Sequence, residues 1–183
     1  MIRTLNDLKE YLKYEKKLYI NPGRKERLID IATQMPNLRI WKFVRLLRKT
    51  EFFYNNRKNP FCGIMYLLYR LRKNNLGIKL GISIFENSFE KGLCIYHEGN
   101  IVVNGNARIG KNCKLHGSNC IGNSGTRMDN PVIGDNVRLG VGAKVIGGVQ
   151  LADNLTVAAG AVVVHSFEEE GIVVGGIPAK KIK

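Results

Sequence analysis

The stretch PVIGDNVRLGVGAKVIGG, residues 131–148, carries a branched aliphatic residue at every sixth position. The same step continues in both directions along the chain. The aliphatic residues at this step are Val103, Ile109, Leu115 and Ile121, then Ile133, Leu139, Val145, Leu151, Val157 and Val163. Only the polar run GNSGTRMDNP, residues 122–131, interrupts the series. A six-residue period matches neither the 3.6-residue period of a helix nor the two-residue alternation of a strand.

Such a period indicates a repeat architecture, a parallel β-helix built from hexapeptides. Each hexapeptide forms one short strand and a corner, so that its aliphatic residue points into a prism. The small residues that recur around these positions, such as Gly110, Gly134, Gly140 and Ala143, suit the tight corners. Successive coils pair their backbones about 4.8 Å apart. If three hexapeptides form one coil, each residue lies directly below the one three hexapeptides further along.

In the first eighty residues, the apolar residues recur at the three- and four-residue intervals of a helix instead. Leu5, Leu8 and Leu12 predict one helix, with Asn6 as the expected N-cap. A short second helix is predicted within residues 23–35, ending before Pro36. In the third, over residues 37–54, one face holds Ile40, Phe43, Val44 and Leu47, and the other sides hold Trp41, Lys42, Arg45, Arg48 and Lys49. The fourth, over residues 61–73, aligns Ile64, Leu67, Leu68 and Leu71.

We therefore expect an α+β protein: a basic α-helical region over residues 1–78, then a parallel β-helix with a C-terminal tail over residues 79–183. No run of about 18 apolar residues is present, and the N-terminus lacks the apolar core of a secretory signal. These features predict a cytoplasmic protein.

The four cysteines show no CxxC pairing, so packed thiols are expected rather than disulfides or a metal site.

The net charge of +14 is concentrated in the first half of the chain. Residues 1–82 hold 19 lysines and arginines against 6 acidic residues, a net charge of +13, whereas residues 83–183 hold 10 against 9. A basic field of this kind attracts phosphate-rich surfaces. For the helix over residues 40–54, the favoured interpretation is a solvated or subunit-packing face. Contact with an anionic membrane is the first alternative, and contact with nucleic acid, for which no recognisable motif is present, is the second.

The segment CIYHEGNIVVNG, residues 94–105, leads into the regular repeats. His97 stands one hexapeptide before Val103, where the pattern would otherwise place an aliphatic residue. A neutral imidazole near pH 7 is a suitable base for removing a proton from a hydroxyl group. His97 is therefore the first candidate for a catalytic residue.

Three segments carry a resemblance to a known family: residues 81–123, residues 131–148 and the closing GGIPAKKI, residues 175–182. With them the chain resembles the left-handed β-helix acyltransferases of the hexapeptide-repeat family. It is most similar to the serine O-acetyltransferase type and to relatives that acetylate sugars of surface polysaccharides. The resemblance implies a homotrimer that binds acetyl-CoA, its acyl donor, in the groove between neighbouring subunits.

The resemblance also implies roles for single residues. His97 matches the family's general base, and His116 resembles a second histidine of the polysaccharide type. The residues matched to acetyl-CoA binding are Gly140, Val141, Ala158, Ala159 and Lys180. The family's acidic residues are absent at Tyr96 and near Ile82, and its serine-binding Arg-His pair falls at Asp129 and Asn130. These departures favour a sugar hydroxyl over free L-serine as acceptor.

Two further expectations concern the neighbours of the histidines. With three hexapeptides in a coil, Glu98 would lie directly below His116, and we predict that its carboxylate supports that imidazole. Arg127 and Asp129 are candidates for lining the acceptor pocket.

The sequence thus predicts an acetyl-CoA-dependent O-acetyltransferase that modifies a sugar hydroxyl in surface-polysaccharide biosynthesis. Its acceptor would be a small molecule or a lipid-linked sugar, and the basic field is compatible with peripheral contact at the anionic inner face of the membrane. Two alternatives stay open: a serine O-acetyltransferase in cysteine biosynthesis, and a catalytically inactive β-helix that acts as a binding or scaffold module.

Overall fold

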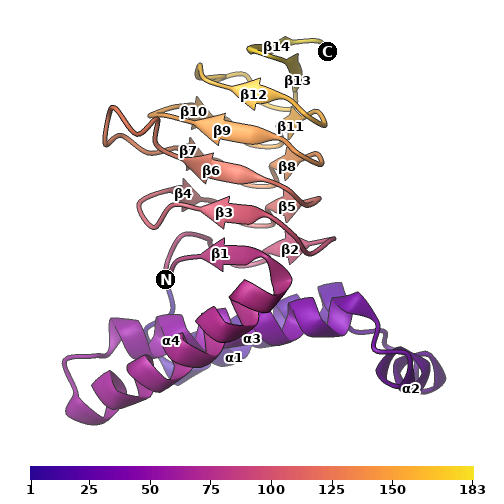
Figure 1. The fold of residues 1–183 in the computed structure, drawn as a ribbon, viewed down its shortest axis with the longest axis vertical. Helices are drawn as coiled ribbons and strands as arrows, with labels where there is room; N and C mark the ends of the chain where they lie inside the picture. The colour runs from indigo at the N-terminus through magenta and orange to yellow at the C-terminus, as the bar shows by residue number, and fades with distance from the viewer.

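The computed structural model describes all residues from Met1 to Lys183. A layer of helices lies across one end of a tall prism of short strands, and the C-terminus lies at the far end (Figure 1). The helices are α1 (Leu5–Tyr19), α2 (Arg24–Ala32), α3 (Pro36–Asn55) and α4 (Pro60–Leu80). The first strand begins just after α4, at Ile82.

Three sheets form the walls of the prism, and the chain visits them in turn. The first contains β1 (Ile82–Ile84), β3 (Ile101–Val103), β6 (Cys120–Gly122), β9 (Lys144–Ile146) and β12 (Val162–Val163). The second contains β4 (Arg108–Ile109), β7 (Val132–Ile133) and β10 (Gln150–Leu151). The third contains β2 (Cys94–Ile95), β5 (Lys114–Leu115), β8 (Arg138–Leu139), β11 (Thr156–Val157), β13 (Val173–Gly176) and β14 (Ala179–Lys181). Every pairing is parallel except that of β13 with β14.

The register confirms the predicted β-helix. Ile133 pairs with Leu151, and Leu139 with Val157, each three hexapeptides further along the chain. In the coil that contains the polar run, paired residues are four hexapeptides apart in the chain instead of three, as Leu115 and Leu139 show. All ten aliphatic residues at the six-residue step are at most 4% exposed, so they form the interior of the prism.

The helices agree with the sequence in their positions and differ in detail. Thr4, not Asn6, is the N-cap of α1: its side chain accepts a bond from the Asp7 backbone, and Asp7 bonds back to the Thr4 backbone. This reciprocal capping box satisfies two helix-terminal N–H groups. The predicted core face of α3 is buried as expected, but Trp41 and Arg48, expected on the other sides, are buried as well.

The apolar residues that the sequence aligns on α4 face solvent, not the interior of the protein. Ile64, Leu67, Leu68 and Leu71 are 45–63% exposed. The buried residues of α4 are instead Lys73, Gly77 and Leu80. Gly77 is required there, because an added β-carbon would lie 2.4 Å from the backbone oxygen of Ile82.

Arg48 joins the helices to the first coil. Its guanidinium is fully buried and donates to the carboxylates of Glu15 on α1 and Glu51 on α3, with shortest distances of 2.7 and 2.9 Å. It also donates to the backbone oxygens of Phe89 and Glu90. The same carboxylates accept backbone N–H groups of the first coil, since Glu15 bonds to Gly92 and Leu93, and Glu51 to Asn87.

The charges in this network depend on one another. Burial by itself would lower the pKa of Arg48, but the adjacent Glu51 and Glu15 outweigh it and raise that pKa. Burial raises the pKa of Glu51, and Arg48 opposes the rise. Removing one member of a buried ionic group leaves its partners charged and without compensation, which typically costs about 3–5 kcal/mol.

We therefore expect Arg48→Met to lower the free energy of unfolding by about 3–5 kcal/mol, measured by urea denaturation. A matched control is Lys181→Met, which removes the exposed ion pair with Glu169. That change should shift the unfolding midpoint far less, because exposed ion pairs contribute little. Equal stabilities of Arg48→Met and the unaltered protein would contradict this role of the network.

Candidate active site

One edge of the prism collects the residues that follow strands β2, β5, β8 and β11. We call it the histidine edge and define it as Tyr96, His97, His116, Gly117, Gly140, Val141, Ala158 and Ala159. Backbone bonds hold its levels together. The N–H groups of Tyr96, His116, Gly140 and Ala158 donate to Leu115, Leu139, Val157 and Val174, at 2.8–3.1 Å. The structure thus brings both histidines and four of the residues matched to acetyl-CoA binding onto one continuous edge: Gly140, Val141, Ala158 and Ala159.

The upper part of this edge carries small residues, which leave room along its surface. A β-carbon on Gly140 would lie 2.6 Å from the backbone nitrogen of Ala159, so the stacking of the coils itself requires glycine. Val141 and Ala159 are exposed. At the far end, β13 and β14 pair Gly175 with Lys180, which places the Lys180 backbone at the top of the edge.

His116 is held on the ring of Tyr96. The two rings are stacked with centroids 4.5 Å apart and planes 25° from parallel. The Nε2 atom of His116 is buried and has no hydrogen-bond partner within the chain. Burial lowers the pKa of His116, and the nearby Arg138, His97 and Lys114 lower it further. This shift favours the neutral imidazole.

His97 lies exposed immediately below Gly117. A β-carbon on Gly117 would lie 3.3 Å from the β-carbon of His97, and the φ of Gly117 is +112°, so glycine is needed at this corner on both grounds. The absence of a side chain at Gly117 leaves room for the His97 imidazole at the surface.

The prediction that Glu98 lies beneath His116 is wrong. Val103 pairs with Ile121 at the regular offset of three hexapeptides, whereas the offset between Ile95 and its partner Leu115 is larger by two positions. The corner that contains His97 is therefore longer than the corner above it. As a result Tyr96 lies beneath His116, and the Glu98 carboxylate pairs with Arg39 of α3, at 3.8 Å.

Asn119 shapes the same corner and was not identified from the sequence. It is fully buried, accepts the N–H of Gly117 at 3.0 Å and donates to the backbone oxygen of Gly140 at 2.7 Å. It thereby links the His116 level to the Gly140 level. Its position shortly before the buried aliphatic Ile121 was the only available signal, and that position is also typical of an ordinary corner residue.

Arg127 and Asp129 lie away from the histidine edge within one protomer. They line a hollow of about 410 Å³ together with His165, at the corner that follows β6, β9 and β12. A single chain therefore does not bring them to His97, as the predicted acceptor pocket required.

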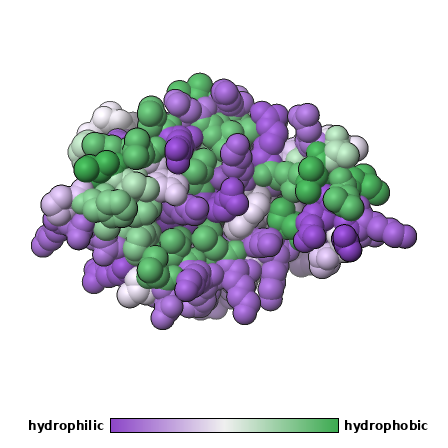
Figure 2. Space-filling model, turned by 90° about the horizontal axis from the view of Figure 1, so that it is seen from below, coloured by the Kyte–Doolittle hydropathy of each residue, from purple (hydrophilic) through white to green (hydrophobic).

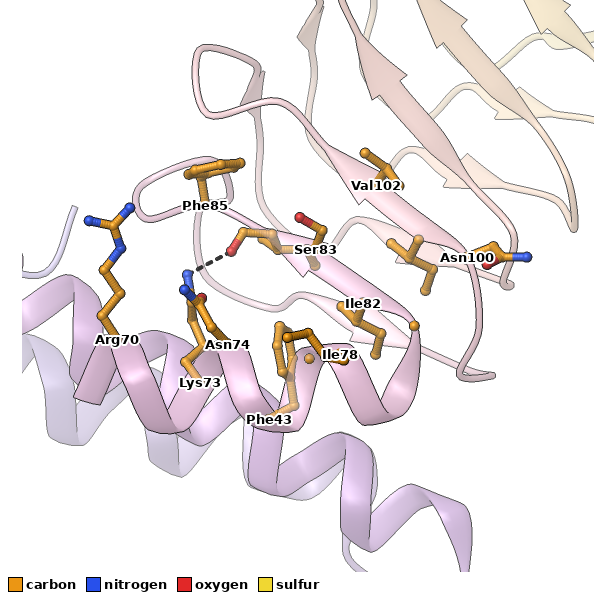
Figure 3. A pocket seen from close by; sticks show the side chains of 14 residues that line it. Phe43, Arg70, Lys73, Asn74, Ile78, Ile82, Ser83, Phe85, Asn100 and Val102 are labelled. Carbon is orange, nitrogen blue, oxygen red and sulfur yellow. Dashed lines mark hydrogen bonds between the residues drawn. The ribbon is translucent and has the colours of Figure 1, made fainter. Parts of the chain in front are cut away.

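A larger cleft of about 470 Å³ opens between α4 and strands β1 and β3 (Figure 3). Asn100, three residues after His97 in the chain, is among its lining residues. Its walls carry the half-exposed ring of Phe85 and the polar side chains of Arg70, Asn74 and Ser83. Lys73 also lines it, but its ammonium group is bound to Glu86 and to the Ile84 backbone.

No family model matches the chain. Among curated proteins, the serine acetyltransferase of Staphylococcus xylosus is 32% identical over 121 residues, which are 64% of this chain and 56% of that protein. The serine acetyltransferase of Synechococcus elongatus is 32% identical over 94 residues, 50% of this chain and 38% of that protein. The matches thus span about half of these relatives or less.

Solved structures resemble nearly the whole chain. The serine acetyltransferase of Neisseria gonorrhoeae superimposes with a TM-score of 0.76 at 21% identity, covering 98% of this chain and 68% of that one. A serine acetyltransferase in complex with CoA gives a TM-score of 0.74 at 17% identity, covering 97% and 71%. The chain has the left-handed β-helix fold of the hexapeptide-repeat acyltransferases, preceded by a helical region. Among proteins of this fold, it is similar in sequence to the serine acetyltransferases.

The lowered pKa of His116 gives a direct test of the site. We expect its imidazole NMR signals to titrate with a midpoint below the ordinary value of 6.5. Because the folded protein then binds this proton less readily than the unfolded chain, the stability that His116 contributes is complete above pH 6.5 and falls as the pH decreases.

The control for that titration is Tyr96→Ala, which removes the stacked ring and opens His116 to water. Its His116 midpoint should move back toward the ordinary value. A midpoint above 6.5 in the unaltered protein would contradict the geometry of the edge.

Proposed function

We propose that the protein is an acetyl-CoA-dependent O-acetyltransferase whose reaction takes place at the histidine edge. The observation that carries the proposal is that two histidines and a column of small residues lie on one edge, in a fold shared with serine acetyltransferases. The matched serine acetyltransferase structure with bound CoA supports acetyl-CoA as the donor.

His97 is the proposed general base. The acceptor hydroxyl loses its proton to the imidazole while its oxygen attacks the thioester carbon. The C–S bond then breaks, and the imidazolium returns the proton to the departing sulfur, so that CoA leaves as a thiol. His116, whose neutral form is favoured and which has a free buried Nε2, is a second polar group for the acceptor or for the developing oxyanion. The pantetheine arm would follow Val141 and Ala159, with Lys180 near the phosphates.

L-serine is the acceptor that the comparisons favour. The relatives that match in sequence are serine acetyltransferases, and one superimposed structure, from soybean, contains serine. A free amino acid needs a cation for its carboxylate and an anion for its ammonium group. Arg39 and the residue after His97, Glu98, form an ion pair and are one set of charged side chains that could serve.

A sugar hydroxyl is the second candidate, and two observations favour it. No carboxylate stands at Tyr96 or Ile82, where the serine acetyltransferase pattern has acidic residues. The cleft between α4 and strands β1 and β3, with its half-exposed Phe85 ring and its amide and hydroxyl side chains, is larger than serine needs and suits a pyranose ring (Figure 3). The acceptor in this case is a sugar of a surface-polysaccharide precursor, free or lipid-linked.

A homotrimer would complete the site. Within one chain the hollow of Arg127, Asp129 and His165 lies on a different edge from His97. In a trimer around an axis parallel to the prism, an edge of this kind can face the histidine edge of the next subunit. We also propose the cytoplasm, which supplies acetyl-CoA, as the compartment of the reaction.

The discriminating experiment follows the release of CoA thiol from acetyl-CoA with L-serine and, separately, with sugar nucleotides or lipid-linked sugars. His97→Ala should lower the rate on the true acceptor by about 2–4 orders of magnitude. Glu26→Gln is the control and should retain activity, because Glu26 is exposed on α2 and lines neither the cleft nor the hollow of Arg127.

Turnover on serine alone would remove the sugar candidate, and turnover on a sugar alone would remove serine. Near-normal activity of His97→Ala would overturn the assignment of the base. If acetyl-CoA supports no turnover and CoA does not raise the unfolding temperature, the protein is a non-catalytic β-helix module.

A further inference from the structure

The outer side of α4 carries a row of exposed apolar side chains. We call this row the apolar stripe and define it as Phe61, Ile64, Leu67, Leu68, Leu71 and Ile78, which are 45–80% exposed. Their spacing places them on one side of the helix, opposite the side that packs on α3. Scattered exposed apolar residues are ordinary, but a row of six on one helix marks an interaction surface.

The charges along the same helix have one sign. The 21 residues of α4 contain Arg70, Arg72, Lys73 and Lys79 and no aspartate or glutamate. Lys73 is neutralised by Glu86, whereas Arg70 and Arg72 lie near the rings of Tyr66 and Tyr69 rather than against carboxylates. Basic residues therefore flank the apolar stripe on both sides.

Helix α2 repeats this composition on a smaller scale. Leu28, Ile29 and Ile31 are 57–61% exposed, and Asp30 is the only buried residue of the helix. Seen from the side opposite the β-helix, the helical layer shows apolar side chains interspersed with many hydrophilic ones (Figure 2).

We propose that the apolar stripe docks the protein onto the surface of an anionic lipid bilayer. In such a contact the apolar side chains enter the boundary between headgroups and acyl chains, while the flanking arginines and lysines reach the lipid phosphates. None of the helices is long and apolar enough to cross a membrane, so the contact is peripheral.

The positive charge of the helical region favours an anionic bilayer over a second copy of the chain as the partner of the apolar stripe. A twofold contact between two apolar stripes would bring two acid-free helices together. In the proposed trimer, a contact of the apolar stripe with the helical region of a neighbour would likewise join two regions that each carry a net charge of +13. The partner has to supply negative charge and accept apolar groups over a broad surface. Anionic lipid meets both requirements.

Docking in this way also orients the cleft. Arg70 and Ile78 line the cleft, and Ile78 also belongs to the apolar stripe, so the cleft would open beside the headgroups. The inference does not depend on which acceptor is acetylated, because it rests on α4 alone.

The test is co-sedimentation of the full chain with vesicles of phosphatidylcholine, alone or mixed with phosphatidylglycerol. We expect binding to the mixed vesicles and weak binding to the neutral ones. Ile64→Ser combined with Leu71→Ser should weaken binding about tenfold or more, since two apolar side chains no longer enter the bilayer. Arg72→Gln combined with Lys79→Gln should weaken it about 25-fold, at about fivefold for each charge.

The control pair, Met128→Ser with Val132→Ser, removes comparably exposed apolar groups from the β-helix and should leave vesicle binding unchanged. Analytical ultracentrifugation of every variant, without lipid, completes the experiment. Failure of the unaltered protein to bind mixed vesicles would overturn the proposal. A lower oligomer mass for the Ile64 and Leu71 variant would overturn it too, because the apolar stripe would then be a subunit contact.

Discussion

The aliphatic residue that each hexapeptide places inside the prism is the constraint on which the rest of the structure depends. Because the ten interior residues are buried and the coils pair their backbones in parallel, the corners above one another are fixed to one register. Residues that follow Ile95, Leu115, Leu139 and Val157 then lie on one edge. The histidine edge follows from the packing of the interior, and loop conformation has little freedom to alter it.

The helical region is joined to this prism by charge as well as by apolar packing. A hydrophobic cluster of 33 buried residues runs from Tyr19 on α1 to Ala179 at the top of the prism. At its base the buried Arg48 network connects two helices to the backbone of the first coil. On the surface, Arg39 of α3 reaches Glu98 beside His97. The helices therefore contribute directly to the surroundings of the proposed catalytic base.

The sequence predicted the features that repeat and missed those that occur once. The interior of the prism was predictable because the same packing requirement recurs at every sixth residue. The same repeat places His116, Gly140 and Ala159 one or two residues after interior positions. It wrongly put His97 beneath Leu115, where the structure has Ile95, and His97 lies below Gly117 instead. Glu98 was misplaced because a corner slightly longer than its neighbour shifts the register, and a local insertion of that size leaves no periodic trace.

The helices show the same limit. Helical spacing aligned Ile64, Leu67, Leu68 and Leu71 correctly, but an amphipathic pattern does not say whether its apolar side meets the core or another surface. Arg48 was assigned to a solvated face because a charged residue is almost never fully buried without partners. Its partners, Glu15 and Glu51, come from two different helices, and their meeting depends on tertiary packing.

A crystal structure of the protein with bound CoA tests the central claim most directly, because it locates the donor relative to the histidine edge. The account predicts that the CoA sulfur lies next to His97 and His116, that the pantetheine arm runs along Val141 and Ala159, and that the phosphates lie near Lys180. CoA bound elsewhere, with its sulfur away from both imidazoles, would contradict the assignment of this edge as the active site.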